Sequence, residues 1–350
     1  MRWLLACSCL LTSLFVGAAS AAQVPDQAPK AGAPLAAPVA PASLQFVAEH
    51  PVEGMPSGNL SGLALCGSEM WTVSDRDDDR IYRLLIDEAP GKAWQATAEP
   101  FVVPGTPESG LSWGTRARVA VGGLLRGGAM DFEGISCDQA GNRYVVSEGY
   151  AAVLLLPAVG EPSWLPLPQS LLRQARASGL LMEFNALYEG IAVSADGKQL
   201  WLAAERQRRG LLKVHNENGT WKCEGNCVML SEGGTAMPPP ELGSERALPI
   251  DFSDIALFKD KLFTLERLAH QICRRDAKTG AQELCWSFAA GALAPERRYD
   301  LPYGVAEALI LDEQGAWIGL DNGEHARADG DGRPYVLRFA APAGGWLGGK

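Results

Sequence analysis

The chain has 350 residues, of which 47% are hydrophobic and 21% charged, so it can bury a large core. Its 39 glycines and 23 prolines favour many short elements joined by turns and exclude a long coiled coil or an extended disordered chain. With 41 acidic and 31 basic residues the formal net charge is −10, which argues against nucleic acid or an anionic membrane as the main partner and favours cations as ligands.

The N-terminal segment has the features of a secretory signal. A basic residue at Arg2 precedes an apolar run, and small residues at 19–21 supply a cleavage site. We therefore predict that residues 1–21 are a signal peptide, that the protein is periplasmic or secreted, and that no integral membrane span follows. Residues 22–43 are rich in Ala and Pro without periodicity, which indicates a flexible linker. The folded domain is expected at residues 44–342.

One hairpin motif recurs five times along the rest of the chain. Each copy has an apolar strand, a polar turn, and a second apolar strand that ends in an acidic residue. The first strands align without gaps at residues 60–65, 132–137, 188–193, 252–257 and 306–311. The closing acids are Asp75, Glu148, Glu205, Glu266 and Asp321. Units of several strands that repeat at this spacing predict an all-β fold, a β-propeller with five motif-bearing blades.

Three further segments complete the predicted ring. The spacing of the closing acids exceeds the usual length of a blade, so a sixth, degenerate blade in residues 86–130 stays open. The strand at residues 44–48 is expected to pair with the last unit and close the ring. Residues 168–177 are rich in Leu, Ala and Arg, which favours a helix between blades.

Six cysteines follow the signal peptide, and an even number in an oxidising compartment suggests disulfides. The expected pairs are Cys223 with Cys227, Cys273 with Cys285, and Cys66 with Cys137. The first pair would close a very small loop, the second flanks a turn as facing strands would, and the third is left over. A zinc site is the weaker interpretation, because only one Cys-x3-Cys is present.

The acidic residues of the repeat predict a metal site. In a propeller the innermost strand begins at the face where the second strand ends, so up to eight carboxylates would converge at one mouth. Like charges this close need protons or cations, and Ca²⁺, which takes about 6–8 oxygen ligands, suits them. The predicted ligands of this divalent metal are Asp75, Glu133, Glu148, Glu189, Glu266, Glu307 and Asp321. Ser61 and Ser253 replace the inner-strand Glu in two units, which excludes a symmetric five-fold ring.

Arginines directly follow three of the closing acids, and two interpretations of them stay open. Arg76, Arg206 and Arg267 either pair locally with the acids, or bind a phosphate or carboxylate oxygen and stabilise charge during hydrolysis. On the second interpretation Arg76 and Arg206 bind substrate. The candidate catalytic residues are then Glu189, Glu205, Arg267 and His325, the last a nearby acid or base.

Several ordered motifs carry a family resemblance. Three motifs occur in order. E-G-x-A with D-G-x-x-L lies in residues 187–205, L-x-x-L-E-R lies in residues 255–267, and D-N lies in residues 318–322. In this pattern the chain resembles the phytase-like family, described as having the esterase-like activity of phytase. More distantly it is similar to SdiA-regulated and gluconolactonase-type propellers, which implies metal ligands at Glu133 and Glu189. The chain departs from the family pattern at 252–254 and 305–308, where glycine is missing.

The resemblance implies a propeller and suggests a calcium-dependent hydrolase, although a fold does not establish a reaction. We expect an exported, phytase-like hydrolase that acts on phosphoesters or on small esters and lactones, with a small anionic or ester substrate and a monomeric state. The alternative is a non-catalytic propeller that binds a ligand or a protein at the same mouth.

Overall fold

The computed structural model describes residues 41–56, 58–107, 110–111, 114, 129–183, 187–323 and 325–348. The predicted signal peptide, residues 1–21, and linker residues 22–40 lie outside the described residues. In the part that is described, no helix combines the length and the apolar character that a membrane crossing requires.

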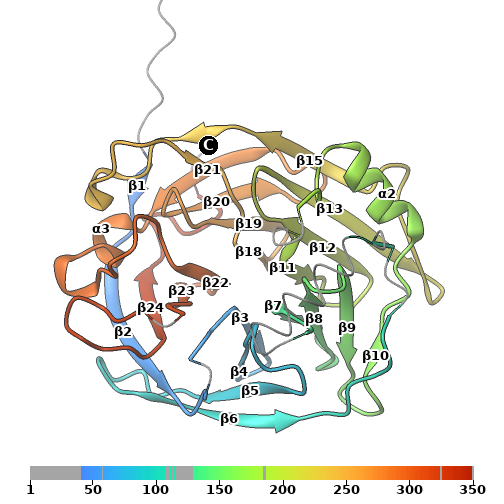
Figure 1. The fold of residues 1–350 in the computed structure, drawn as a ribbon, viewed down its shortest axis with the longest axis horizontal. Helices are drawn as coiled ribbons and strands as arrows, with labels where there is room; N and C mark the ends of the chain where they lie inside the picture. The colour runs from blue at the N-terminus through green and yellow to red at the C-terminus, as the bar shows by residue number, and fades with distance from the viewer. Residues whose placement is uncertain are drawn as a thin grey trace, which may run out of the picture. The chain divides into compact units, whose positions relative to one another are not determined.

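Five inner strands contact one another in a closed cycle. They are β3 (Gly62–Cys66), β7 (Phe132–Cys137), β11 (Tyr188–Val193), β18 (Asp254–Phe258) and β22 (Ala306–Leu311). Each inner strand contacts the next, and β22 contacts β3 again. Figure 1 shows the sheets of residues 41–348 arranged around this centre. The all-β propeller prediction is confirmed, and five blades are present in the described residues.

Each blade is built outward from its inner strand by antiparallel pairing. Blade 1 continues with β4 (Glu69–Val73), β5 (Arg80–Leu85) and β6 (Trp94–Pro100). Blade 2 continues with β8 (Arg143–Ser147), β9 (Ala152–Leu156) and β10 (Ser163–Trp164). Blade 3 continues with β12 (Gln199–Ala204) and β13 (Arg208–Glu217), and β13 pairs with both β14 (Thr220–Lys222) and β15 (Val228–Gly233).

The last two blades use strands from the N-terminal part of the chain. Blade 4 continues with β19 (Lys261–Glu266), β20 (Gln271–Asp276) and β21 (Gln282–Ser287), to which β1 (Ala42–Ser43) adds in parallel. Blade 5 continues with β23 (Gly315–Leu320) and β24 (Tyr335–Ala340), followed by β2 (Phe46–Glu53). Because β2 pairs with β24 and also meets β6 in parallel, the predicted closure of the ring by an N-terminal strand is confirmed.

The sixth blade that the spacing left open has no inner strand in the described residues. Between residues 86 and 130, those that are described contain one strand, β6. It pairs with β5 at residues 95–100 and is therefore the fourth strand of blade 1. The rest of the segment that could hold this blade, residues 108–109, 112–113 and 115–128, lies outside the described residues.

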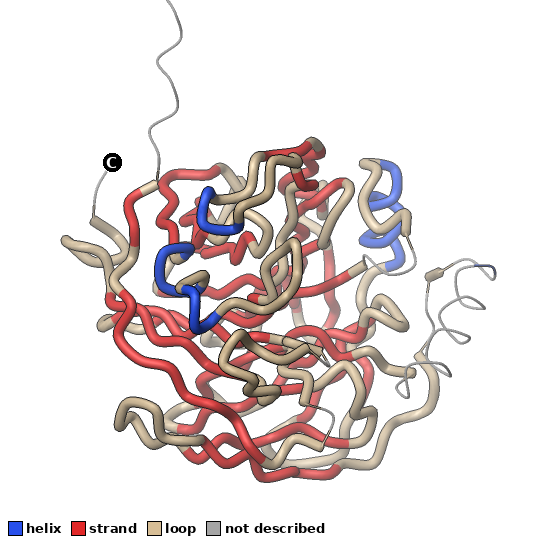
Figure 2. The backbone as a smooth tube through the Cα atoms, turned by 60° about the vertical axis from the view of Figure 1, so that its left-hand side comes forward, coloured by secondary structure: helices blue, strands red, loops and turns tan. Residues whose placement is uncertain are grey.

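In the residues that the structure describes, helix occurs in short segments, as Figure 2 shows. The predicted helix between blades 2 and 3 is α2 (Gln169–Ala177), which buries Leu171 and Ala175 one turn apart. The other short elements are α3 (Ala289–Ala292), the 3-10 turns η1 (Pro240–Leu242) and η2 (Pro295–Arg297), and the hairpin of β16 (Thr235–Ala236) and β17 (Leu248–Pro249).

Apolar side chains fill the spaces between adjacent blades. One cluster joins Val146 and Val153 of blade 2 to Ile191 and Leu202 of blade 3. The alternation of the strands places these residues on one face of each sheet, where burial removes them from water. The three disulfides of the structure join the expected pairs, Cys66–Cys137, Cys223–Cys227 and Cys273–Cys285. The first of them links the inner strands of blades 1 and 2.

Candidate functional site

β-bulges set the direction of three inner-strand glutamates. In β7, β11 and β22 the pairing register shifts across one residue near the start of the strand. The skipped residues are Glu133, Glu189 and Glu307. Blades 1 and 4 have serine at this position and pair from the next residue onward without a shift. A bulge changes the direction of a side chain at a strand end. These glutamates therefore do not follow the regular alternation of side chains between the two faces of the sheet.

The glycine after two of these glutamates allows neighbouring inner strands to approach. A Cβ atom on Gly134 would lie 2.7 Å from the backbone oxygen of Glu189, and one on Gly190 would lie 2.7 Å from the nitrogen of Ile255. No side chain fits at these distances. In the E-G pair of the repeat, the glutamate therefore supplies an acidic side chain, and the glycine allows the backbone to contact the next blade closely.

Three acids from blades 2 and 3 come together in a group that we call the buried acid cluster. Glu148, Glu189 and Glu205 each offer a carboxylate oxygen, and these oxygens lie within 4.8 Å of one another. All three residues are buried. The backbone N–H of Leu187 donates to Oε1 of Glu148 at 2.8 Å and so links the two blades beside the cluster.

A second group of acids comes from blades 1 and 2. Carboxylate oxygens of Asp75, Asp131 and Glu133 also lie within 4.8 Å of one another. Asn59 donates to Oδ1 of Asp75 at 2.6 Å. The hairpin ends of three blades thus bring six carboxylates into two compact groups.

Burial and mutual repulsion raise the pKa of these acids. Desolvation, followed by the charges of neighbouring acids, raises the pKa values of Glu133, Glu148 and Glu189 well above the usual range of a carboxyl group. Burial, opposed by Arg267, raises the pKa of Glu307 to about 8. Burial and the nearby Asp75 raise the pKa of Asp321 to about 6. Nearby positive charge would therefore stabilise the ionised form of each of these groups.

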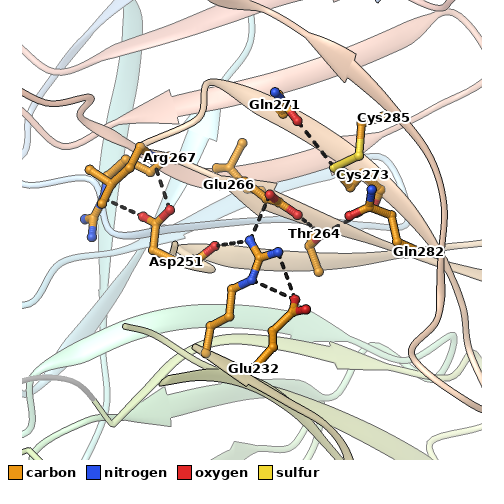
Figure 3. A network of polar contacts seen from close by, with 12 residues as sticks. Glu232, Asp251, Thr264, Glu266, Arg267, Gln271, Cys273, Gln282 and Cys285 are labelled. Carbon is orange, nitrogen blue, oxygen red and sulfur yellow. Dashed lines mark hydrogen bonds and ion pairs between the residues drawn. A yellow bond between two sulfur atoms is a disulfide. The ribbon is translucent and has the colours of Figure 1, made fainter. Parts of the chain in front are cut away.

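Arg267 joins three blades through ion pairs. Its guanidinium bonds to Glu205 at 2.7 Å, to Asp251 at 3.2 Å, and to Glu307. Figure 3 shows Asp251 beside Arg267. Oε2 of Glu205 and Oε2 of Glu307 are nevertheless buried and accept no hydrogen bond from any described residue. Two carboxylate oxygens are therefore still available for a ligand.

The other two candidate arginines are more exposed. Arg76 pairs with Asp75 at 3.1 Å and Arg206 pairs with Glu205, and their side chains are 34% and 36% exposed. Arg76 and Arg206 thus each pair with the preceding acid, and substrate binding by these two arginines stays a prediction. Arg267 instead bonds acids from other parts of the ring.

Glu266 has different surroundings from the other closing acids. Its carboxylate bonds to Arg209 at 2.8 Å and to Arg275 at 3.0 Å, and all three side chains are buried. Glu232 completes these contacts at 2.8 Å from Arg209, and Figure 3 shows Glu266 and Glu232 in this arrangement. We call these four residues the Glu266 network. The predicted ligand Glu266 belongs to neither group of close carboxylates in the described residues.

The remaining candidates lie on the loop after β23 and the turn after β19. Oδ1 of Asp321 accepts a hydrogen bond from Gly323 at 2.8 Å. His325 is exposed, and its backbone bonds Asn322. His270, which also follows a repeat acid, is buried against Phe288, and burial lowers its pKa to about 4.

The sequence interpretation missed Asp131 and Asp251, which contribute to the site. Each lies two residues before the inner-strand position, in Asp131-Phe132-Glu133 and Asp251-Phe252-Ser253. Asn59 occupies the same position in blade 1. An alignment of the repeat extended by two residues upstream contains this signal, although it does not show that the side chains turn towards the acids.

Solved structures resemble the chain only distantly. The PQQ-bound aldose sugar dehydrogenase from Streptomyces coelicolor is 14% identical, with 85% of this chain and 97% of that chain covered and a TM-score of 0.40. Virginiamycin B lyase from Staphylococcus aureus is 10% identical, with 84% and 98% covered and a TM-score of 0.39. These likenesses carry no argument about activity.

The sequence comparisons are more specific. No curated protein sequence matches the chain. The family described as phytase-like, with the esterase-like activity of phytase, matches residues 55–279. This match spans more than half of the chain and includes the inner strands of blades 1 to 4. The protein belongs to the phytase-like family.

Proposed function

We propose that this protein is an exported, metal-assisted hydrolase of phosphoesters or small carboxylic esters and lactones. Its family supports a hydrolase-type propeller. The observation that carries the proposal is the buried acid cluster, in which oxygens of Glu148, Glu189 and Glu205 lie within 4.8 Å of one another. Three buried carboxylates at this distance suit a divalent cation, with Ca²⁺ as the first choice because it takes oxygen ligands.

The donor set fits such a cation. Glu148 and Glu189 supply carboxylates whose pKa burial and neighbouring charges raise, so a positive charge would stabilise them. Glu205 lies beside them, and its Oε2 accepts no hydrogen bond from any described residue, which leaves that oxygen available as a base. Asp75, Asp131 and Glu133 offer a second group of oxygens from the adjoining blades. A bound divalent cation would polarise the ester oxygen and lower the barrier to attack by water.

The chain's own residues then have distinct roles. Arg206, whose side chain is 36% exposed, binds an anionic oxygen of the substrate, and Arg76 does so on the side of blade 1. Arg267 is a positioning residue, because it holds Glu205 and Glu307 in place. Glu205 accepts a proton from the attacking water through Oε2. The water oxygen bonds to phosphorus or to the acyl carbon, the ester bond breaks, and the released alcohol takes up that proton. His325 stays a predicted acid or base.

Export is part of the proposal. Three disulfides suit an oxidising compartment, and the sequence of residues 1–21 has the pattern of a secretory signal. The periplasm or the exterior of the cell would also provide calcium. Mass spectrometry of the protein secreted or released from the periplasm tests this point, since cleavage after residue 21 is expected.

Hydrolysis of p-nitrophenyl phosphate and p-nitrophenyl acetate, with CaCl₂ or with EGTA, tests the activity. We expect turnover that EGTA abolishes and calcium restores, and a loss of at least 100-fold in kcat/KM for Glu148→Gln. Glu232→Gln, which makes the same change of charge in the Glu266 network, is the control and should keep its activity. Arg206→Gln should raise KM for the phosphate ester more than for the acetate ester.

A second candidate is a binding propeller without catalysis. The deep burial of the cluster favours it, because Glu189 is 7% exposed and Glu205 is 1% exposed. Calorimetric binding of Ca²⁺ to the wild type, lost in Glu148→Gln, together with no turnover of either ester, would select this candidate. Turnover that persists in EGTA and in Glu148→Gln would contradict the proposed metal site.

A further inference from the structure

A large groove lies between α2 and the end of blade 2. It has a volume of about 760 Å³, which is within the range of about 300–1,000 Å³ typical of sites for small organic ligands. Its walls include Ala151, Trp164, Leu165 and Leu172. Leu171 and Tyr188, which belong to the hydrophobic core between blades 2 and 3, also line it. An apolar molecule in this groove would extend the core.

The charged side chains among the described lining residues of the groove are all positive. Arg173 and Arg176 line it, and the described lining residues include no Asp or Glu. The two arginines are three residues apart on α2 and therefore share a face of the helix. In a chain with ten more acidic than basic residues, two arginines on one face of a helix that lines a groove favour a ligand with a negative charge.

The indole of Trp164 is held in place. Its Nε1 donates to the backbone oxygen of Gly105 at 2.8 Å, and its ring makes an edge contact with Tyr150 at 5.9 Å. A fixed aromatic wall opposite a helix that carries two guanidinium groups gives the groove an apolar side and a cationic side. Such a pair of surfaces is suited to a ligand with one apolar and one anionic end.

We propose that this groove binds an amphipathic organic anion, a molecule with an aliphatic or aromatic body and a carboxylate or phosphate end. The apolar body lies against Trp164, Leu165 and Leu172, and the anionic end lies at Arg173 and Arg176. Its described lining residues include no member of the buried acid cluster, and binding requires neither a metal nor turnover. Free fatty or aromatic acids and the headgroups of anionic lipids share this chemistry.

Isothermal titration with dodecanoate below its micellar concentration, in EGTA, tests the proposal, with dodecanol as the neutral probe. We expect one molecule of dodecanoate to bind per chain. Binding should weaken at least tenfold, about 1.4 kcal/mol, for dodecanol and for the Arg173→Gln/Arg176→Gln double variant. Lys198→Gln/Arg246→Gln removes the same charge from exposed positions elsewhere and should bind like the wild type. Leu172→Trp, which narrows the groove, should weaken both probes.

Three results would overturn the proposal. They are binding of dodecanol as tightly as dodecanoate, equal loss of affinity in the two double variants, and binding to phosphatidylglycerol vesicles without binding of monomeric dodecanoate. The last result would identify a membrane surface as the ligand. Circular dichroism of each variant establishes that it is folded. Because the titration is done in EGTA and without an ester, failure of the proposed hydrolysis does not affect its outcome.

Discussion

Glu205 and Glu266 occupy the same position in neighbouring repeats, yet their surroundings differ. Glu205 pairs with Arg206 and Arg267 through one oxygen only, lies within 4.8 Å of two other carboxylates, and keeps its other oxygen without a hydrogen bond from any described residue. Glu266 has both oxygens bonded, one to Arg209 and one to Arg275. The first surroundings leave negative charge for a ligand to neutralise, and the second neutralise it within the protein.

Side chains from outside the hairpin cause this difference. Arg209 begins in β13 of blade 3 and reaches the carboxylate at the end of β19 in blade 4, where Arg275 of β20 joins it. Around Glu205 the acids Glu148 and Glu189 lie close by as well, so its two arginines, Arg206 and Arg267, face three carboxylates instead of one. The position of an acid in the repeat therefore places it at a hairpin end, and the adjoining blade decides whether it can bind a ligand.

The largest effect that this comparison predicts is on stability. Glu266→Ala leaves Arg209 and Arg275 buried without their main partner, so we expect it to lower the free energy of unfolding by about 3–5 kcal/mol. Urea unfolding at pH 7 measures this loss. Glu232→Ala removes a carboxylate that is 35% exposed from the same network and should cost less than about 1 kcal/mol. Equal small losses for the two variants would show that Glu266 is not the main partner.

Much of the fold was predictable because its pattern is local. Alternating apolar residues, polar turns and the recurring acids predict hairpins, and the cysteine pairs follow from hairpin geometry and elimination. Contacts between blades are not indicated by any local sequence pattern. Nothing in the sequence around residue 266 indicates that Arg209, 57 residues earlier, bonds Glu266. Likewise the sequence predicts an arginine beside Glu266, but Arg267 bonds Glu205, Asp251 and Glu307 instead.

The two histidines that follow repeat acids extend the comparison. His270 is buried beside Phe288, and the charged groups that line the same cavity are Arg297 and Arg298. His325 is exposed. Burial lowers the pKa of His270 from 6.5 to about 4, so the unfolded chain binds the proton more readily than the folded protein does. Its contribution to stability is complete above pH 6.5, falls as the pH decreases, and is fully lost near pH 4.

We therefore expect His270 to lower the free energy of unfolding by up to about 3 kcal/mol between pH 6.5 and pH 4, against the opposite effect of the acids whose pKa is raised. Urea unfolding of the wild type and of His270→Leu across this range measures it, because the stability of the wild type relative to the variant should fall by that amount as the pH decreases. His325→Ala is the control and should keep the slope of the wild type. A slope unchanged in His270→Leu would show that other groups take up the proton.

The smallest expected effect is on the stability of a variant in the buried acid cluster, and its direction should depend on calcium. Because Glu189 is repelled by Glu205, Glu133 and Glu148, Glu189→Gln should raise the free energy of unfolding in EGTA by about 1 kcal/mol. In saturating Ca²⁺ the order should reverse, because the cation stabilises the wild type and the variant lacks one of its ligands. Thermal unfolding of both proteins in EGTA and in about 5 mM CaCl₂ measures these two differences. A calcium concentration on the order of 5 mM is enough to fill a site with a millimolar dissociation constant. Glu266→Gln should be less stable than the wild type in both buffers, since its carboxylate is already neutralised by arginine. If Glu189→Gln behaved in the same way, the cluster would be a second internally balanced network, and the contrast between the two repeats would vanish.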